Sequence, residues 1–376
     1  MSRTSGSHLS DAHATDNGET TTRRTTPHHP STNNTGAHGT STHKTGTRRT
    51  LLGAVVAVLA VLVTTGCSST GVYTTTPVPT AKPSSTPTAA ATSAPTVNCG
   101  NPLASFAPTG PNPAPGSAMP AGSYMATIQK HGRLIAGVSA DTLLLGARNP
   151  LNGQIEGFDI DMLKAVSQAI FNDPNKIEYR VITTAQRIPA LTDGSVDIVA
   201  RAMTINCARW QQIDFSTEYY RAGQKVLVAK SATVNGVPVR NMADLKGKRV
   251  CAPNGSTSMD KLRTFPGLIP VGSDTHTGCL VLFQQGQVDA ITGDDTILAG
   301  LAAQDPYASV VKAPAFTSEP YGLGVSKKHP EFVRFVNNVL AQMRTDGQWT
   351  KAYDTWLKAA LGPAPAPPAA VYGRQP

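Results

Sequence analysis

The sequence predicts an α/β protein with two parallel-sheet domains that are joined by two crossings of the chain. Three observations lead to this prediction. After Pro120, short apolar runs alternate with helical patterns; a helix end, a Gly turn and a strand follow one another at 191–198 and again at 285–295; and a last strand, at 321–326, follows the second half. Strands that alternate with helices form parallel sheets whose faces the helices cover.

The first domain is expected to be discontinuous, with residues 121–219 and 318–362. Its helices are expected where apolar residues recur every three or four positions, and its strands where short apolar runs end at turn residues. In order along the chain, these patterns predict helices at 124–131, 158–171, 185–191, 331–346 and 353–361, and strands at 133–138, 176–182, 196–203 and 321–326.

The second domain is expected to fill residues 220–317. The same signals predict strands at 224–230, 248–252, 268–271 and 290–292, with helices at 277–285 and 296–303. The chain would cross between the domains near 219–223 and 317–322. Two such crossings can act as hinges between the domains.

The segment 197–215 carries a pattern of chemical groups. Its apolar run includes Thr204, and Arg209 follows five residues later. A strand that ends at Thr204 and turns into a short helix would direct this hydroxyl, the following N–H groups and the guanidinium at one point. Guanidinium groups match the geometry of a carboxylate, and helix N-termini favour anions. The segment therefore indicates a carboxylate site, and the alternative is an ordinary strand–helix turn with a solvated arginine.

The G-F-D-I-D motif at 157–161, the turn at 191–198 and the segment 285–295 together resemble the extracellular solute-binding proteins of family 3, which serve bacterial ABC transporters for polar amino acids. The resemblance covers residues 124–361. It implies a periplasmic-binding-protein type II fold whose two lobes close on an amino acid, with no enzymatic activity, cofactor or metal ion. It also implies a monomer that presents its ligand to an ABC permease or to a membrane signalling receptor.

Carried over residue by residue, the resemblance places the ligand's α-carboxylate on Arg209 and on the stretch that includes Ala202 and Thr204. It places the α-ammonium group on Asp294, with Asp295 as the second choice. The structural alternative for Asp294 is an N-cap of the helix that follows it.

The loop 253–258 resembles the family's Gly/Ser/Thr loop at a helix N-terminus. Through this loop, Ser256 and Thr257 would hold the same carboxylate from the second domain. Many relatives have a lysine ahead of the loop, whereas this chain has Pro253, so the lysine contact is not expected here.

Arg201 and Arg148 are candidates for the groups that select the ligand's side chain. Arg201 interrupts an apolar run, and strand alternation would place it on the same face as Met203. Arg148 lies in the opening loop of the first domain. Two additional guanidinium groups favour an acidic amino acid, glutamate or aspartate, or one of their amides. The alternative for Arg201 is a structural ion pair with a nearby carboxylate.

The N-terminal region predicts export and attachment to a membrane. Residues 1–50 have almost no apolar side chains and are expected to be disordered. Two arginines then precede an apolar run at 51–63, which suits the core of a signal peptide at 48–67. The run ends at Gly-Cys, as in a lipobox, so Cys67 is expected to be acylated and to hold the protein at the extracytoplasmic face of the cell membrane. The alternative is an unlipidated protein that keeps the apolar segment as its anchor.

Residues 68–120 are rich in Ser, Thr, Pro, Ala and Gly. This composition favours an extended, solvated tether that would carry the folded part away from the membrane. The end of the chain, 363–376, has a similar composition and is expected not to fold.

The five cysteines agree with an exported protein. If Cys67 is acylated, the even remainder indicates two disulfides, for which three connectivities are possible. Cys251 and Cys279 lie in the same half of the chain and are expected to pair, which leaves Cys99 with Cys207. A metal site is disfavoured, because no two cysteines lie close together in the sequence.

Other classes of function fit the sequence less well. The formal net charge of +9 is not gathered in a basic run, and six Lys/Arg precede Cys67, so nucleic acid binding is not expected. No Ser/His/Asp order or Cys/His pair indicates an enzyme, and His276 and His329 look like loop residues. A dehydratase of the same fold and an adhesive wall protein are the remaining alternatives.

Overall fold

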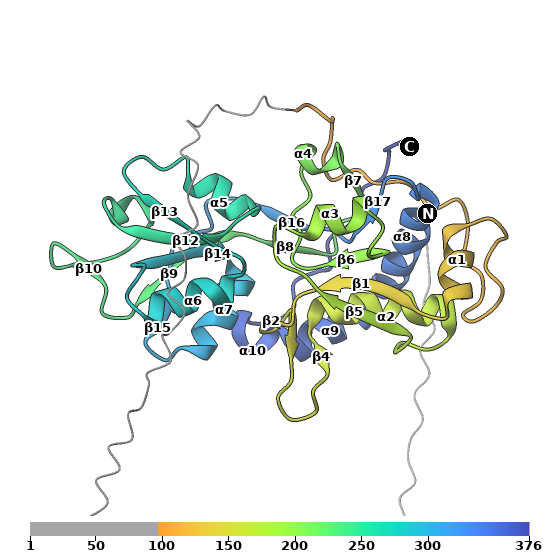
Figure 1. The fold of residues 1–376 in the computed structure, drawn as a ribbon, viewed down its shortest axis with the longest axis horizontal. Coiled ribbons are helices and arrows are strands. Elements are labelled where there is room, and N and C mark those ends of the chain that lie inside the picture. The colour runs from red at the N-terminus through yellow and green to blue at the C-terminus, as the bar shows by residue number, and fades with distance from the viewer. Residues whose placement is uncertain (1–96, 376) are drawn as a thin grey trace, which may run out of the picture. The chain divides into compact units, whose positions relative to one another are not determined.

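The computed structural model describes residues 97–375 (Figure 1). The disordered extension, the signal peptide, the acylation of Cys67 and most of the tether are predictions for residues outside that range. Within residues 97–375, no helix is both long enough and apolar enough to cross a membrane.

Lobe 1, which comprises residues 97–219 and 322–375, is built on a five-stranded sheet with the order β5-β1-β6-β17-β7 (Figure 1). Its strand β1 (Leu134–Val138) pairs in parallel with β5 (Ile177–Val181) and β6 (Ile198–Ala200). Near the C-terminus, β17 (Gly324–Ser326) pairs antiparallel with β6 and with β7 (Ile213–Phe215). The chain therefore returns to its first sheet after it has completed the second.

The helices of lobe 1 enclose its core. They are α1 (Tyr124–His131), α2 (Phe158–Phe171), α3 (Arg187–Thr192), α4 (Cys207–Trp210), α8 (Pro330–Thr345), α9 (Gln348–Trp356) and α10 (Lys358–Leu361). Helix α2 starts after Gly157, which has φ of 143° and where a Cβ would clash with the Leu145 backbone, so only glycine fits. Phe158 is fully buried and meets Trp349 edge-on, with ring centroids 5.8 Å apart. These aromatic contacts hold α2 against α9.

Lobe 2, which comprises residues 223–318, is built on a sheet with the order β13-β12-β14-β9-β15. Strands β12 (Arg249–Pro253), β13 (Ile269–Ser273) and β14 (Ala290–Asp294) are parallel, whereas β9 (Gln224–Ala229) and β15 (Ala308–Val310) are antiparallel to their neighbours. The helical segments of this lobe are η1 (Met242–Leu245), α5 (Thr257–Leu262), α6 (His276–Gln284) and α7 (Asp295–Gln304).

Two crossings join the lobes. β8 (Tyr220–Ala222) leaves lobe 1, β16 (Glu319–Tyr321) returns to it, and the two strands pair antiparallel. The returning strand is attached to lobe 1, because the Ile205 N–H donates to the Pro320 carbonyl over 2.7 Å. That the crossings act as hinges remains a prediction.

Several short strands were not predicted from the sequence. They form the sheet β2-β3-β4 (Asp141–Thr142, Gly146–Arg148 and Ile155–Glu156) and the hairpin of β10 and β11 (Thr233–Val234 and Val237–Pro238), and they also include β7, β8 and β15. A strand of two or three residues is too short to show an alternating pattern by itself, so periodicity does not predict it.

The α/β fold class is confirmed, with two differences in detail. Both large sheets are mixed, because each contains antiparallel strands. The strand expected at 196–203 ends at Ala200, and Ala202 has a φ of 42°. Alternation therefore stops before Arg201 and Met203, and the expectation that they share one strand face is wrong.

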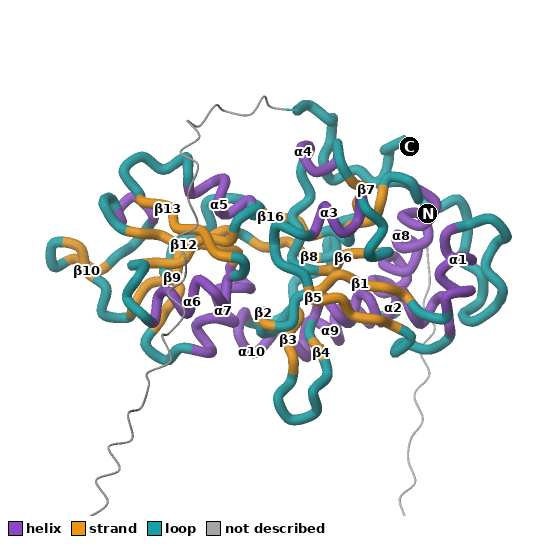
Figure 2. Tube along the Cα trace, in the orientation of Figure 1, coloured by secondary structure: helices purple, strands orange, loops and turns teal. Residues whose placement is uncertain are grey.

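The part of the predicted tether that the structure describes is packed on lobe 1. Residues 97–123 contain no helix or strand beyond one isolated bridge (Figure 2), but Phe106 is buried and the Ser105 hydroxyl donates to the Phe215 carbonyl over 2.7 Å. The chain end is held there too, because the Ser105 N–H donates to the Val371 carbonyl. The expectations of a tether up to residue 120 and of an unfolded end are therefore corrected: both segments find apolar and hydrogen-bonding partners on this lobe.

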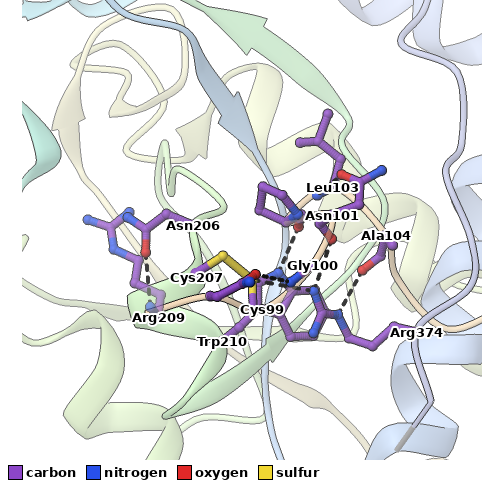
Figure 3. Close-up of a disulfide and its surroundings, with 12 residues drawn as sticks. Cys99, Gly100, Asn101, Leu103, Ala104, Asn206, Cys207, Arg209, Trp210 and Arg374 are labelled. Carbon is purple, nitrogen blue, oxygen red and sulfur yellow. Dashed lines mark hydrogen bonds between the residues drawn. A yellow bond between two sulfur atoms is a disulfide. The ribbon is translucent and has the colours of Figure 1, made fainter. Parts of the chain in front are cut away.

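The structure contains both predicted disulfides. Cys251 and Cys279 join β12 to α6, and Cys99 and Cys207 join the N-terminal segment to α4. Figure 3 shows the second bridge beside Arg374, whose guanidinium donates to the Ala104 carbonyl over 2.8 Å and lies 3.8 Å from the centre of a Trp ring of α4. Both ends of the folded part of the chain therefore converge on α4.

The double substitution of Cys99 and Cys207 by serine is expected to lower the free energy of unfolding by about 2–4 kcal/mol. The bridge closes a loop of 108 residues, so its loss enlarges the unfolded ensemble. Urea unfolding of the two proteins under non-oxidising and non-reducing conditions measures the difference, and the Cys251–Cys279 bridge is retained in both. Equal midpoints and equal slopes would contradict the expectation.

Candidate ligand-binding cleft

Polar residues from both lobes surround a cavity of about 20 Å³. They are Ser139, Thr142, Asp159, Thr184, Arg187, Arg201 and Thr204 from lobe 1, and Ser256, Thr257, Ser258, His276 and Asp294 from lobe 2, and the apolar Ala202 and Ile297 complete the lining. The lobes touch at this point, because the Thr184 N–H donates to the Asp274 carbonyl and the Thr277 hydroxyl donates to the Asp141 carbonyl. The structure therefore shows the cleft closed, with room for about one water molecule.

Arg187, at the start of α3, supplies a guanidinium to the cleft that the sequence analysis missed. Its Nη1 donates to the Ala202 carbonyl over 3.0 Å, and its Nη2 donates to the Gly255 carbonyl of lobe 2 over 3.2 Å. Burial lowers the pKa of this group well below its usual value, and the neighbouring charges of Arg209 and Arg201 lower it further. Such a buried cluster of cations favours an anion as its partner.

Arg201 lines the cleft and makes no ion pair. Its Nε donates to the Ile182 carbonyl over 2.9 Å, and its Nη1 donates to the Thr184 hydroxyl over 2.7 Å. Among the described residues, no carboxylate oxygen lies within ion-pair distance of this guanidinium. The alternative for Arg201, a structural ion pair, is therefore not observed among the described residues.

Arg209, expected to hold the α-carboxylate, lies behind the cavity wall. Its Nη1 donates to the Thr204 carbonyl over 2.7 Å and its Nη2 donates to the Gly255 carbonyl over 3.3 Å. It is buried, and together with Arg187 it borders a second cavity next to Gly255. A carboxylate is a stronger partner for a guanidinium than a carbonyl oxygen is, so a ligand could replace the carbonyl contacts of these arginines.

The loop of lobe 2 brings its backbone to the arginines. Gly255 has φ of 72°, and a Cβ there would lie 3.0 Å from the Ala185 Cα in lobe 1. The Ser256 hydroxyl caps α5 by accepting from the Met259 N–H over 3.0 Å and donates to the Pro253 carbonyl over 2.6 Å. Glycine thus permits the close approach of the lobes, and the Ser256 side chain is occupied by the turn.

Asp294 faces the cleft with one oxygen that has no partner. Its Oδ2 accepts from the Tyr321 hydroxyl over 2.6 Å, whereas Oδ1 is buried and receives no hydrogen bond from the described residues. The side chain makes no N-cap bond to α7, so the structural alternative is not realised. Burial raises the pKa of Asp294 to about 7, and the nearby Glu319 contributes in the same direction.

Asp295, the second choice, points elsewhere. Its carboxylate accepts from the N–H groups of Gly223 and Thr296 at 3.3 and 2.8 Å, and it borders a different cavity. Asp294 and Asp295 are adjacent at the end of β14, but only Asp294 lines the cleft.

The sequence pattern predicts a loop at His276, but this residue is the buried first residue of α6. Its Nε2 is buried and has no hydrogen-bond partner among the described residues. Burial lowers the pKa of His276 to about 3, and Arg201 contributes in the same direction, so the imidazole is neutral at pH 7. Thr275 directly before it is the N-cap, accepting from the Gly278 N–H over 3.0 Å, and this signal would have placed His276 on a helix.

Asp159, from the G-F-D-I-D motif, shapes the wall of the cleft. Its Oδ2 accepts from the Ala202 N–H over 2.8 Å and its Oδ1 accepts from the Tyr219 hydroxyl over 2.6 Å. Burial raises the pKa of Asp159 to about 6, whereas the hydrogen bond from Tyr219 opposes this. The bond to Ala202 holds that residue in its left-handed conformation, and the neighbouring carbonyls then face Arg187.

The structure does not support the expectation that Arg148 selects the ligand's side chain. It lies in β3, is exposed, and its Nη1 donates to the Gly153 carbonyl over 2.6 Å. It is absent from the lining of the cleft, because the β3–β4 hairpin directs it into solvent.

Known proteins resemble this chain over most of the two lobes. Residues 134–359 match the bacterial extracellular solute-binding proteins, family 3. The chain belongs to this family. Over 235 residues it is 35% identical to the ABC transporter glutamine-binding protein GlnH of Bacillus subtilis, which covers 62% of this chain and 84% of the relative. It is 31% identical over 239 residues to the glutamate-binding protein GluB of Corynebacterium glutamicum, with 61% and 79% covered.

Solved structures of the family have the same fold. An ancestral arginine-binding protein bound to glutamine matches with a TM-score of 0.56 and 31% identity, over 60% of this chain and 98% of that one. The ancestral amino acid-binding protein AncCDT-1, a precursor of cyclohexadienyl dehydratase, matches with a TM-score of 0.57 and 33% identity, over 63% and 100% of the two chains. The family resemblance and the expected type II fold are therefore confirmed, and the relatives are solute-binding proteins of transport systems rather than enzymes.

Proposed function

We propose that this protein captures an acidic amino acid, glutamate or aspartate, by closure of its two lobes and presents it to an ABC permease. The observation that carries the proposal is a cleft with guanidinium groups on one side and, on the other, an Asp294 carboxylate oxygen that has no partner within residues 97–375. A zwitterion supplies one charge to each side. Buried polar atoms without partners destabilise a protein, so a ligand that satisfies them stabilises the closed form.

Each charge of the ligand has a matching group in the cleft. The α-ammonium group would bind Oδ1 of Asp294. The α-carboxylate would bind Arg187, with Arg209, Thr204 and the α5 loop behind it. These groups satisfy both buried charges of the zwitterion, which is the condition for binding it in a closed cleft.

The side-chain end of the ligand would lie near Arg201 and His276. The guanidinium of Arg201 carries no carboxylate partner among the described residues, and a distal carboxylate would provide one. The unpartnered Nε2 of His276 is a second polar group for that end of the ligand. An imidazole nitrogen can also accept a hydrogen bond from an amide, so glutamine and asparagine are the competing ligands.

The relatives support this class of ligand. They include binding proteins for glutamine, for glutamate, and for glutamate and aspartate. Attachment of this chain to the membrane through Cys67, and its action as a monomer, belong to the same proposal. A sensor that signals through a membrane receptor is the second candidate, since ligand-driven closure of two lobes serves either partner.

Isothermal titration calorimetry of the full chain in detergent tests the ligand. Glutamate and aspartate are expected to bind with micromolar or lower Kd, and more tightly than glutamine and asparagine. Lysine and arginine are the matched controls, because they share the α-groups but place a cation beside Arg201. Binding of lysine, arginine or sugars alone would refute the acidic ligand, and binding of amides alone would shift the assignment to glutamine.

A further inference from the structure

Glu319 is a buried carboxylate that does not line the cleft and yet bonds to two of its threonines. Its Oε2 accepts from the Thr204 hydroxyl over 2.7 Å and from the Thr257 hydroxyl over 2.8 Å. Its Oε1 accepts from the Thr317 hydroxyl over 2.6 Å. The side chain is only 3% exposed, so these three hydroxyls replace the water that would otherwise solvate the carboxylate.

The three donors come from both lobes. Thr204 follows β6 in lobe 1, whereas Thr257, the first residue of α5, and Thr317, just before β16, belong to lobe 2. The hydroxyl oxygens of Thr204 and Thr257 lie 3.3 Å apart. One carboxylate oxygen thus brings together a side chain from each lobe at the edge of the ligand cavity.

The backbone decides which of these bonds separation of the lobes would break. Glu319 is held to lobe 1, because its neighbour Pro320 accepts from the Ile205 N–H and Tyr321 forms a bridge with Thr204. Thr257 is the first residue of α5, which belongs to lobe 2. When the lobes part about the crossings, the bond to Thr257 is therefore lost, whereas the bond to Thr204 is retained.

We propose that Glu319 is a positioning residue that latches the closed lobes: one of its carboxylate oxygens holds Thr204 of lobe 1 and Thr257 of lobe 2 together. The latch would slow the release of a bound amino acid, although Glu319 does not contact that ligand. This effect on a ligand rests on the proposed function. A charged acceptor makes stronger hydrogen bonds than a neutral one, so the carboxylate holds Thr257 more firmly than an amide would.

Glu319→Gln tests the latch, with Glu218→Gln as the matched control. Glu218 is also 3% exposed and lies beside β8, but its carboxylate pairs with Arg221 rather than with a threonine of the cleft. With glutamate as the probe, stopped-flow fluorescence is expected to show a dissociation rate about ten-fold faster for Glu319→Gln. The association rate of this variant, and both rates of Glu218→Gln, should stay within about two-fold of the wild type.

A second comparison does not depend on ligand binding. Small-angle scattering of the ligand-free full chain is expected to show a larger open fraction for Glu319→Gln than for the wild type or Glu218→Gln. If the wild type bound no amino acid, the proposed function would fail, and this comparison would still decide the latch. Equal scattering and equal dissociation rates in wild type and Glu319→Gln would overturn it.

Thr257→Val provides a variant of nearly the same shape that leaves Glu319 in place. It removes the same bond across the lobes, so it is expected to open the ligand-free protein as Glu319→Gln does. The double variant should be no more open than the more open single variant, because both changes remove one interaction. Additive opening, or an effect of Glu218→Gln as large as that of Glu319→Gln, would contradict the latch.

Discussion

Replacing Asp294 with asparagine is expected to weaken glutamate binding about a thousand-fold at pH 8, which corresponds to about 4 kcal/mol. In the closed protein the ligand's ammonium group would be buried against Oδ1, the oxygen that has no partner among the described residues. Asparagine retains the shape and an acceptor for the Tyr321 hydroxyl but removes the charge. The ammonium group would then be buried without a counter-ion, and this is the costly state.

The pH dependence of the wild type provides a second measure of the same group. Burial, with contributions from Glu319 and Asp295, raises the pKa of Asp294 to about 7 against the opposing effects of the Tyr321 hydrogen bond and Arg187. Below that pH the carboxyl group is protonated and must release its proton to bind an ammonium group. Affinity should therefore fall as the pH falls, by roughly fifty-fold between pH 7 and pH 5 if the pKa in the complex lies below that range.

Calorimetry from pH 5 to pH 8, in two buffers of different ionisation enthalpy, measures both the affinity and the proton released. Asp294→Asn should lose the part of the pH dependence centred near pH 7 together with the affinity, whereas Asp159, whose pKa burial raises to about 6, still titrates in the variant. Asp295→Asn is the matched control, because the Asp295 carboxylate serves the N–H groups of Gly223 and Thr296. Should Asp294→Asn keep the wild-type affinity or the wild-type pH profile, the assignment of the ammonium site would be wrong.

Replacing Arg187 with glutamine is expected to weaken glutamate binding by a similar factor, about a thousand-fold. Its guanidinium lines the cleft and also spans from the Ala202 carbonyl in lobe 1 to the Gly255 carbonyl in lobe 2. The substitution removes a partner of the ligand carboxylate and one of the contacts that hold the lobes together. The affinity of Arg187→Lys for glutamate should lie between those of the wild type and Arg187→Gln, because lysine keeps the charge but has no planar guanidinium group.

Arg148→Gln is the matched control for this prediction. Sequence analysis offered Arg148 as a ligand-binding residue, but the structure places it in solvent on the Gly153 carbonyl. Titration with glutamate should therefore give the wild-type Kd for Arg148→Gln and a large loss for Arg187→Gln. The reverse ranking would mean that the opening loop, rather than the start of α3, carries the specificity of the site.

Much of the fold was predictable because it depends on neighbours in the sequence. The helix expected at 124–131 has those bounds in the structure, where Ser123 caps its start and Gly132 ends it in the left-handed conformation. Both are short-range effects that a single sequence displays. The two disulfides were also paired correctly, since the division of the chain into halves left few arrangements.

The composition of the cleft was predictable only in part. Arg201, Thr204, Thr257 and Asp294 were expected at the site and line one cavity, whereas Arg187 and His276 were missed. Arg187 looks like an ordinary residue of an amphipathic helix. Its partner Gly255 lies 68 positions further along the chain, so no local pattern relates them.

By itself, the sequence determined the type of fold, the family and the residue types that a zwitterion requires, because periodicity, turn residues and family motifs are local. Only the tertiary structure decided which arginines reach the cleft, that Asp294 rather than Asp295 faces it, and that Glu319 joins Thr204 to Thr257. Those outcomes depend on the contacts between the two lobes. Burial and hydrogen bonds between segments that are distant in the chain determine these contacts, and such long-range interactions leave no local pattern in the sequence.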